Sequence, residues 1–148
     1  MSAVIRRRRM LRSAVPIGWA AGLPAALAHE YFTPYFTVVH PWTRASAAGA
    51  TTARIGMSFL DVTQADRLIG AQSPLAQGAE LIASDGVALS GIAITAGQTT
   101  TLSEIGIHLR LRGLTQGLEI GREYPLTLVF EKAGALKASF LVDFPAPA

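Results

Sequence analysis

Cysteine is absent from the 148-residue sequence, which excludes disulfide scaffolds, thiolate zinc sites and cysteine nucleophiles. Acidic residues are absent before Glu30, whereas five of the thirteen basic residues stand in the first 28 positions. The remaining residues carry eight basic and ten acidic side chains, a formal charge of −2. The pI near 9.8 is therefore a property of the beginning of the chain. The rest lacks a basic stripe with interleaved aromatics, so nucleic acid is not an expected partner.

Long apolar runs are also missing. The first 28 residues instead have the three parts of a secretory signal: arginines at 6–9, an apolar stretch at 14–25 and the small-x-small pattern Ala26-Leu27-Ala28. That stretch is shorter than the ~20 apolar residues of a membrane span. We expect cleavage after Ala28 and a periplasmic mature domain of residues 29–148, with no stable membrane span. The arginine run also fits a twin-arginine export signal, and an uncleaved N-terminal anchor is the alternative.

Helical periodicity is lacking, because no segment keeps a 3.6-residue apolar stripe for three turns. Apolar and polar residues alternate instead, and residues 125–131 and 136–143 flank the turn Lys132-Ala133-Gly134, which predicts a β-hairpin. Several such short strands predict an all-β, single-domain Greek-key β-sandwich or small barrel. Trp42 is expected to fill its core, and Pro41 to stand at a sheet edge or strand start. The other predicted strands are residues 36–40, 52–62, 67–72, 79–83, 91–95, 99–102 and 107–113.

Catalytic motifs are not found. No serine stands in a Gly-x-Ser-x-Gly elbow, no pair of carboxylates stands out, and no glycine-rich phosphate loop is present. We therefore expect a protein that is not an enzyme.

Histidines are few, and all three, His29, His40 and His108, are candidate metal ligands. Cleavage after Ala28 makes His29 the first residue, whose α-amino group and imidazole together chelate a divalent metal ion. The alternative for His29 is a loose terminus without a ligand role. His40, which precedes Pro41 and Trp42, is interpreted more readily as a packed or capped histidine than as a ligand.

His108 lies in a predicted strand that also contains Arg110 and Arg112. Alternation places Ile107 and Leu109 in the core, and His108, Arg110 and Arg112 on the wetter face. Two guanidiniums beside an imidazole repel a cation and favour an anion or an acidic partner. The alternative is an ordinary solvated strand face with a surface histidine.

A series of short stretches in a fixed order runs through the sequence after the leader. These stretches are Ala28-His29-Glu30-Tyr31, His40-Pro41-Trp42-Thr43-Arg44-Ala45, Asp66-Arg67-Leu68-Ile69-Gly70-Ala71 with Ser73-Pro74, Ala79-Glu80-Leu81, Ile94-Thr95-Ala96-Gly97, Gly106-Ile107-His108-Leu109, Gly113-Leu114 and residues 125–134. Through them the chain resembles the PCu(A)C-type periplasmic copper chaperones from about Ala28 to Val142. This resemblance implies a cupredoxin-like Greek-key β-sandwich, copper as the bound metal, and a copper-accepting partner such as a cytochrome oxidase assembly component.

The resemblance implies a Cu(I) site of two histidines and two methionines, and this chain departs from it. The second histidine falls on His108, but the methionine two positions later is Arg110, and the position of the first histidine is Ile82. The intervening segment contains no methionine, and Met57, the one methionine left after cleavage, has the pattern of a core residue. A Cu(I) site of the family type is therefore not expected at His108.

Two hypotheses remain open at this point. In the first, the protein binds Cu(II) or Cu(I) through a rebuilt site, with the His29 amino terminus and imidazole as ligands and His40 or His108 as further nitrogens. In the second, it is a metal-free accessory or interaction module that uses the face of Arg110 and Arg112.

Overall fold

The computed structural model describes residues 29–144, so the predicted leader and its cleavage site lie outside the described residues. Within this range the chain forms strands and no α-helix, which confirms the all-β prediction. None of the described residues belongs to a helix long and apolar enough to cross a membrane. The strands are β1 (Glu30–Phe32), β2 (Thr37–Arg44), β3 (Thr52–Leu60), β4 (Asp66–Gln72), β5 (Gly78–Ile82), β6 (Ala88–Leu89), β7 (Ile92–Ile94), β8 (Thr100–Leu102), β9 (His108–Arg112), β10 (Glu123–Phe130) and β11 (Gly134–Asp143).

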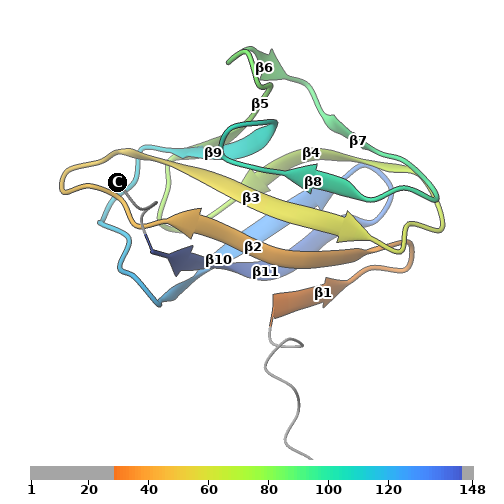
Figure 1. Cartoon of the computed structure of the whole chain (residues 1–148), viewed down its shortest axis with the longest axis horizontal. Coiled ribbons are helices and arrows are strands. Elements are labelled where there is room, and N and C mark those ends of the chain that lie inside the picture. The colour runs from red at the N-terminus through yellow and green to blue at the C-terminus, as the bar shows by residue number, and fades with distance from the viewer. Residues whose placement is uncertain (1–28, 145–148) are drawn as a thin grey trace, which may run out of the picture.

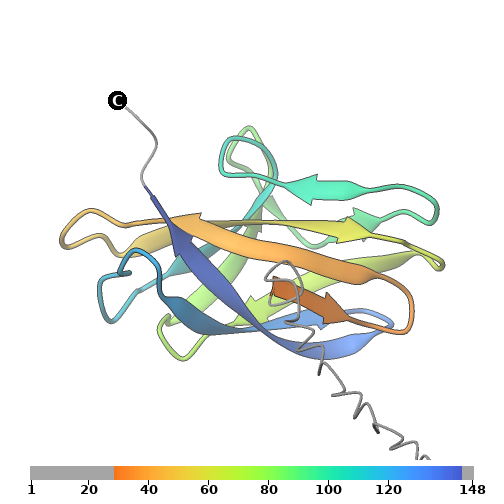
Figure 2. The same ribbon diagram turned by 60° about the horizontal axis from the view of Figure 1, so that its bottom comes forward.

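The strands form one hydrogen-bonded sheet that folds back on itself into two layers, as Figures 1 and 2 show. Its order is β6-β5-β9-β3-β2-β11-β10-β4-β7, with β1 added to β2 and β8 added to β3. Neighbouring strands are antiparallel except β2 and β11, which run parallel. Because β2 pairs with the last strand of the sequence, the chain closes as a single Greek-key sandwich, as predicted.

The predicted C-terminal hairpin is confirmed, with β10 and β11 paired from Glu123↔Leu141 to Phe130↔Gly134. Gly134 has φ +76°, a left-handed conformation that glycine adopts at little cost. Asp66 on β4 holds the turn from the neighbouring strand, because its carboxylate accepts the amides of Lys132 and Ala133 at 2.8 and 2.9 Å. A buried carboxylate of one strand thus fixes the turn of another.

Aromatic side chains fill the space between the two layers. The rings of Phe36, Phe59 and Phe130 meet edge to face, with centroids 4.9 to 6.0 Å apart, a favoured geometry for aromatic pairs. Met57 is buried in the same core, 1 % exposed, so the prediction that it packs in the core is confirmed.

Trp42 does not fill the core, and this expectation was wrong. Gly56, its ladder partner on β3, lies between the inward-facing Ile55 and Met57 and therefore faces outward. The absent side chain of Gly56 leaves the space that the indole of Trp42 occupies, half-buried on the outer face.

Pro41 stands neither at an edge nor at a strand start. It is buried inside β2 at a bulge, where the register with β3 shifts between Val39 and Trp42. A bulge tolerates proline because the ladder hydrogen bond is already interrupted there. The bulge also sets the backbone of the preceding residue, His40.

Candidate functional site

His29 and His40 are brought together by the pairing of β1 with β2. Glu30 pairs with Val39 in this antiparallel ladder. His29, which directly precedes β1, therefore lies beside His40, which follows Val39 on β2. The two imidazole rings meet nearly at right angles, with their centroids 5.6 Å apart. Tyr31 anchors β1 further, because its hydroxyl donates to the carbonyl of Ser139 on β11 at 3.3 Å. His29, directly before β1, therefore lies in contact with His40 and Glu123; whether it has a ligand role stays a prediction.

Glu123 completes the polar surroundings of His29. One carboxylate oxygen of Glu123 lies 3.1 Å from Nδ1 of His29, and the two side chains are 44 % and 26 % exposed. The residue is the first of β10, so the contact joins the N-terminal strand to the opposite end of the sequence. Because the pair is largely solvent-accessible, the contact orients the imidazole more than it stabilises the fold.

His40 has a backbone conformation that is uncommon for a residue with a side chain, with φ +50°. Left-handed backbone costs a non-glycine residue about 1–2 kcal/mol. Such conformations persist where the surrounding structure imposes them, and they cluster at functional sites. Here the bulge at Pro41 imposes it, and the result is an imidazole that faces His29.

His108 lies in a different part of the molecule. It stands on β9, which β3 separates from β2, and it lines a hollow of about 100 Å³ together with Arg54 and Arg110. Its Nδ1 lies 2.9 Å from the carbonyl oxygen of Gly106. The structure therefore brings His29 and His40 together and leaves His108 out of that pair.

The predicted exposure of this strand was wrong at its first residues. His108 is buried, 5 % exposed, and Ile107 is 39 % exposed. The alternation holds further along, since Leu109 and Leu111 are fully buried. The imidazole of His108 contacts the carbonyl of Gly106 in the loop before β9, and period-two reasoning cannot foresee such a contact.

Arg110 and Arg112 are not a free anionic-partner face, because both meet Glu80 on β5. Nη2 of Arg110 lies 2.6 Å from one carboxylate oxygen of Glu80, and Nε of Arg112 lies 3.7 Å from the other. The hydrogen bond from Arg110 lowers the pKa of the Glu80 carboxyl, and desolvation opposes that shift. The charge of these two arginines is thus partly neutralised within the protein.

Within residues 29–144 no group of three or more His, Cys, Asp or Glu side chains is arranged to hold a metal ion. The pair His29–His40 brings two imidazoles together. Sequence reasoning missed Glu123 and Arg54 as members of the two sites. Neither has a local signal, because each reaches its site through pairing of distant strands.

Comparisons with known proteins agree with the fold. A family profile described as "Putative lipoprotein LpqE-like" matches residues 36–142. No protein of curated function matches in sequence.

Among solved structures, a copper-bound PCuAC domain from PmoF2 superimposes with a TM-score of 0.73 and 29 % identity, covering 79 % of this chain and 99 % of that domain. The apo PmoF2 domain gives 0.69 and 30 %, covering 80 % and 98 %. Cu(I)-bound DR1885 from Deinococcus radiodurans gives 0.65 and 23 %, covering 76 % and 80 %, a likeness of fold alone.

Proposed function

The chain belongs to the LpqE-like family and has a PCuAC-type domain, and from this premise we propose that it binds and delivers copper through a site built on His29 and His40. The observation that carries the proposal is the meeting of the two imidazoles, with centroids 5.6 Å apart. A solved domain of this type, that of PmoF2, is copper-bound. Copper is the cargo of the site, and no catalytic step is assigned to the protein.

The donor set fits Cu(II) once the chain begins at His29. Cleavage after Ala28 frees an α-amino group, which closes a six-membered chelate ring with Nδ1 of the same residue. His40 then supplies a third nitrogen, and amine and imidazole donors suit Cu(II). Copper binding at Nδ1 replaces the present 3.1 Å contact of that atom with the Glu123 carboxylate, which then lies close enough to offset the charge of the ion.

His108 is not proposed as a ligand. Arg54 and Arg110 line the same hollow, and permanently charged guanidiniums disfavour a cation there. The thioethers that would favour Cu(I) are also missing, because Met57 is enclosed in the core. The proposed site is thus nitrogen-based and lies elsewhere on the sandwich.

Export to the periplasm through the N-terminal leader is part of this proposal, and so is a copper-accepting partner such as a cytochrome oxidase assembly component. The arginine-rich start and the Ala26-Leu27-Ala28 pattern support export. A cysteine-linked lipid has no attachment point in this sequence, because it contains no cysteine.

The test is a titration of residues 29–148 with Cu(II) and Cu(I), with the N-terminus verified by mass. We expect one Cu(II) per chain, and a large loss of affinity when one extra residue precedes His29, because the chelating amine then belongs to another residue. His108→Ala serves as the matched control and should bind as the parent does. Unchanged affinity after the N-terminal extension would overturn the site. Absence of binding by either ion would favour the metal-free interaction module instead.

A further inference from the structure

We propose that the outer face of β3 and β9 has a carboxylate-binding pocket centred on Arg54. The proposal is independent of the copper site, because His29 and His40 do not line this pocket. It rests on the arrangement of charges along the face, on the unpaired state of Arg54 and on the hollow beside it.

Arginines stand directly opposite one another on this face. Arg54 of β3 is the ladder partner of Arg110 on β9, and Arg110 is the ladder partner of Glu80 on β5. Side chains of directly opposed residues share a face, and like charges in that position destabilise a sheet. The carboxylate of Glu80 offsets the charge of Arg110, whose Nη2 lies 2.6 Å from it. Glu80 is on β5, however, and β9 separates β5 from the β3 strand that carries Arg54.

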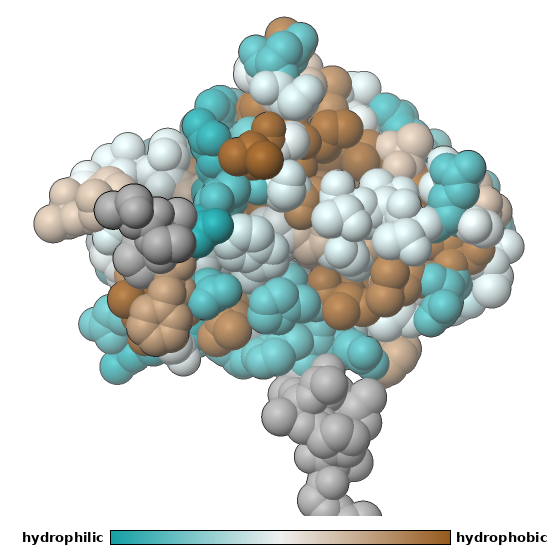
Figure 3. Space-filling model, viewed as in Figure 1, coloured by the Kyte–Doolittle hydropathy of each residue, from teal (hydrophilic) through white to brown (hydrophobic). Residues whose placement is uncertain are grey.

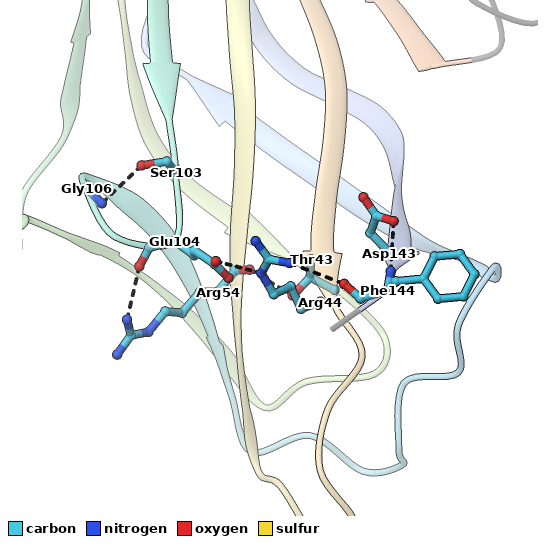
Figure 4. A network of polar contacts seen from close by, with 8 residues as sticks. All are labelled: Thr43, Arg44, Arg54, Ser103, Glu104, Gly106, Asp143 and Phe144. Atoms are coloured by element: carbon cyan, nitrogen blue, oxygen red, sulfur yellow. Dashed lines mark hydrogen bonds and ion pairs between the residues drawn. The ribbon is translucent and has the colours of Figure 1, made fainter. Parts of the chain in front are cut away.

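Arg54 itself has no carboxylate partner among residues 29–144. Its Nη1 donates to the backbone carbonyl of Glu104 at 3.0 Å, whereas the carboxylate of Glu104 is taken by Nε of Arg44 at 2.6 Å. Figure 4 shows Glu104 between these two arginines, with its carbonyl toward Arg54 and its carboxylate toward Arg44. A guanidinium has five N–H donors, so most of the hydrogen-bonding capacity of Arg54 is left for a ligand.

The face as a whole carries more positive than negative charge. Four arginines, at positions 44, 54, 110 and 112, accompany Glu80 and Glu104. Asp85, between the lining residues Ser84 and Gly86, adds one negative charge nearby, and one of its carboxylate oxygens accepts the amide of Val87 at 3.1 Å. Four positive side chains thus stand against three negative ones. Outside these residues, the sequence after position 28 carries four basic and seven acidic side chains, so the rest of the described chain is acidic. An anionic group is therefore attracted to this face in preference to others.

A hollow of about 100 Å³ adjoins Arg54. Arg54, Arg110 and His108 line it from the sheet, and the loops containing Gly86 and Gly106 line it from the sides. This space admits a few water molecules and hence a carboxylate group, which matches the planar fork of a guanidinium. A phosphate, with more negative charge, would meet stronger repulsion from Glu80 and Glu104.

Apolar side chains border the pocket. Ile105 lines the pocket and is 85 % exposed, and Val87, which follows the lining residue Gly86, is 58 % exposed. In Figure 3 hydrophobic side chains gather beneath the β5–β6 tip, with polar ones beside them. The carboxylate can come from a free acid or from an acidic side chain of a docked protein. The two sources differ in whether the apolar border takes part.

The test uses ¹⁵N NMR of residues 29–148, which contain every described strand, to follow backbone amides and arginine Nε–H groups. The probes are sodium acetate and a capped Ala-Glu-Ala peptide, with capped Ala-Gln-Ala and sodium chloride as controls. We expect saturable chemical-shift changes at Arg54, Gly106 and His108. The affinity for acetate and for the peptide should fall at least tenfold in Arg54→Gln. Arg122→Gln, which removes an exposed arginine paired with Glu119, should bind as the parent does.

The outcomes separate the two sources. Peptide binding that is tighter than acetate binding and that shifts Ile105 and Val87 indicates a protein side chain, whereas equal binding indicates a free acid. Shifts that never saturate with either probe, or that persist in Arg54→Gln, would overturn the pocket. Copper is not used in this experiment, so failure of the pocket and failure of the copper site are distinguishable.

Discussion

The imidazoles of His29 and His40 lie nearly perpendicular, with centroids 5.6 Å apart. The backbone of His40 has a left-handed conformation at this contact, with φ +50°. The proposed copper ligand His40 is thus also the residue that bears a local backbone cost. This coincidence allows the two roles to be separated by the choice of substitution.

We expect His40→Gly to be more stable than His40→Ala by about 1 kcal/mol, because glycine adopts positive φ without the steric cost of a side chain. Both variants should lose Cu(II) affinity alike, since each lacks the imidazole. Removing a group that only hydrogen-bonds to a metal ligand costs about 10–100-fold, so loss of a direct ligand should cost at least as much. Urea unfolding measures the first effect and Cu(II) titration the second. Equal stability of the two variants would contradict the left-handed backbone of His40. Retained Cu(II) affinity in either variant would contradict its proposed role as a ligand.

Asp66→Asn should destabilise the fold by about 1.5–3 kcal/mol, the usual worth of hydrogen bonds to a charged group. The carboxylate is 6 % exposed and accepts the amides of Arg67, Lys132 and Ala133. An asparagine has one acceptor oxygen, so one of these amides would face an NH₂ group. Asp143→Asn is the control, because the exposed Asp143 accepts only the amide of Phe144, and thermal unfolding should hardly change. A loss no larger than that of the control would show that Asp66 does not hold the hairpin turn.

The strand pattern was predictable because alternation of apolar and polar residues follows from the geometry of a sheet with one buried face. It placed β10 and β11 to within two residues at each end and predicted the turn between them. It did not reveal β1, whose three residues are too few for a period. Yet the pairing of β1 with β2 sets the distance between His29 and His40, so the geometry of the candidate site was not accessible from sequence alone.

Sequence alternation also failed to predict the packing of Trp42 and the ion pair of Glu80. Trp42 was expected in the core because large aromatics usually are buried, but the missing side chain of Gly56 opened a place on the outer face. Glu80 neutralises Arg110 across two strands that are thirty residues apart in the chain. Such contacts depend on the order of strands in the sheet, which periodicity does not specify.

Gly56→Ala should cost about 1–3 kcal/mol of stability, as overpacking in a close-packed region does. A Cβ at this position would lie 2.8 Å from Nε1 of Trp42 and 2.8 Å from the carbonyl oxygen of Leu102. Gly70→Ala is the matched control in a strand, because a Cβ there meets nothing within 4 Å. Chemical denaturation of both variants checks the difference. A tolerated Gly56→Ala would mean that the indole lies elsewhere.

The acid stability of the protein should depend on Glu80. Hydrogen bonding from Arg110 lowers the pKa of the Glu80 carboxyl in the folded state. Its stabilising contribution is therefore fully present above the pKa that Glu80 has in the unfolded chain. The contribution is lost as the pH falls through the lower, folded-state pKa. The unfolding free energies of the parent and of Glu80→Gln should differ at neutral pH and converge in acid. Urea unfolding across this range measures both, and a constant difference would contradict the contact.

Met57→Leu tests whether any thioether takes part in copper binding. Met57 is the one methionine among the described residues and is 1 % exposed, on β3 opposite Leu102. Leucine nearly conserves its volume, so the unfolding free energy should change by less than about 1.5 kcal/mol. The affinities for Cu(I) and Cu(II) should both be unchanged, because the proposed ligands are nitrogens near β1. A fall in Cu(I) affinity alone, at unchanged stability, would require Met57 to leave the core to bind the ion. In that case the nitrogen-based site would be wrong for Cu(I) and would stand only for Cu(II).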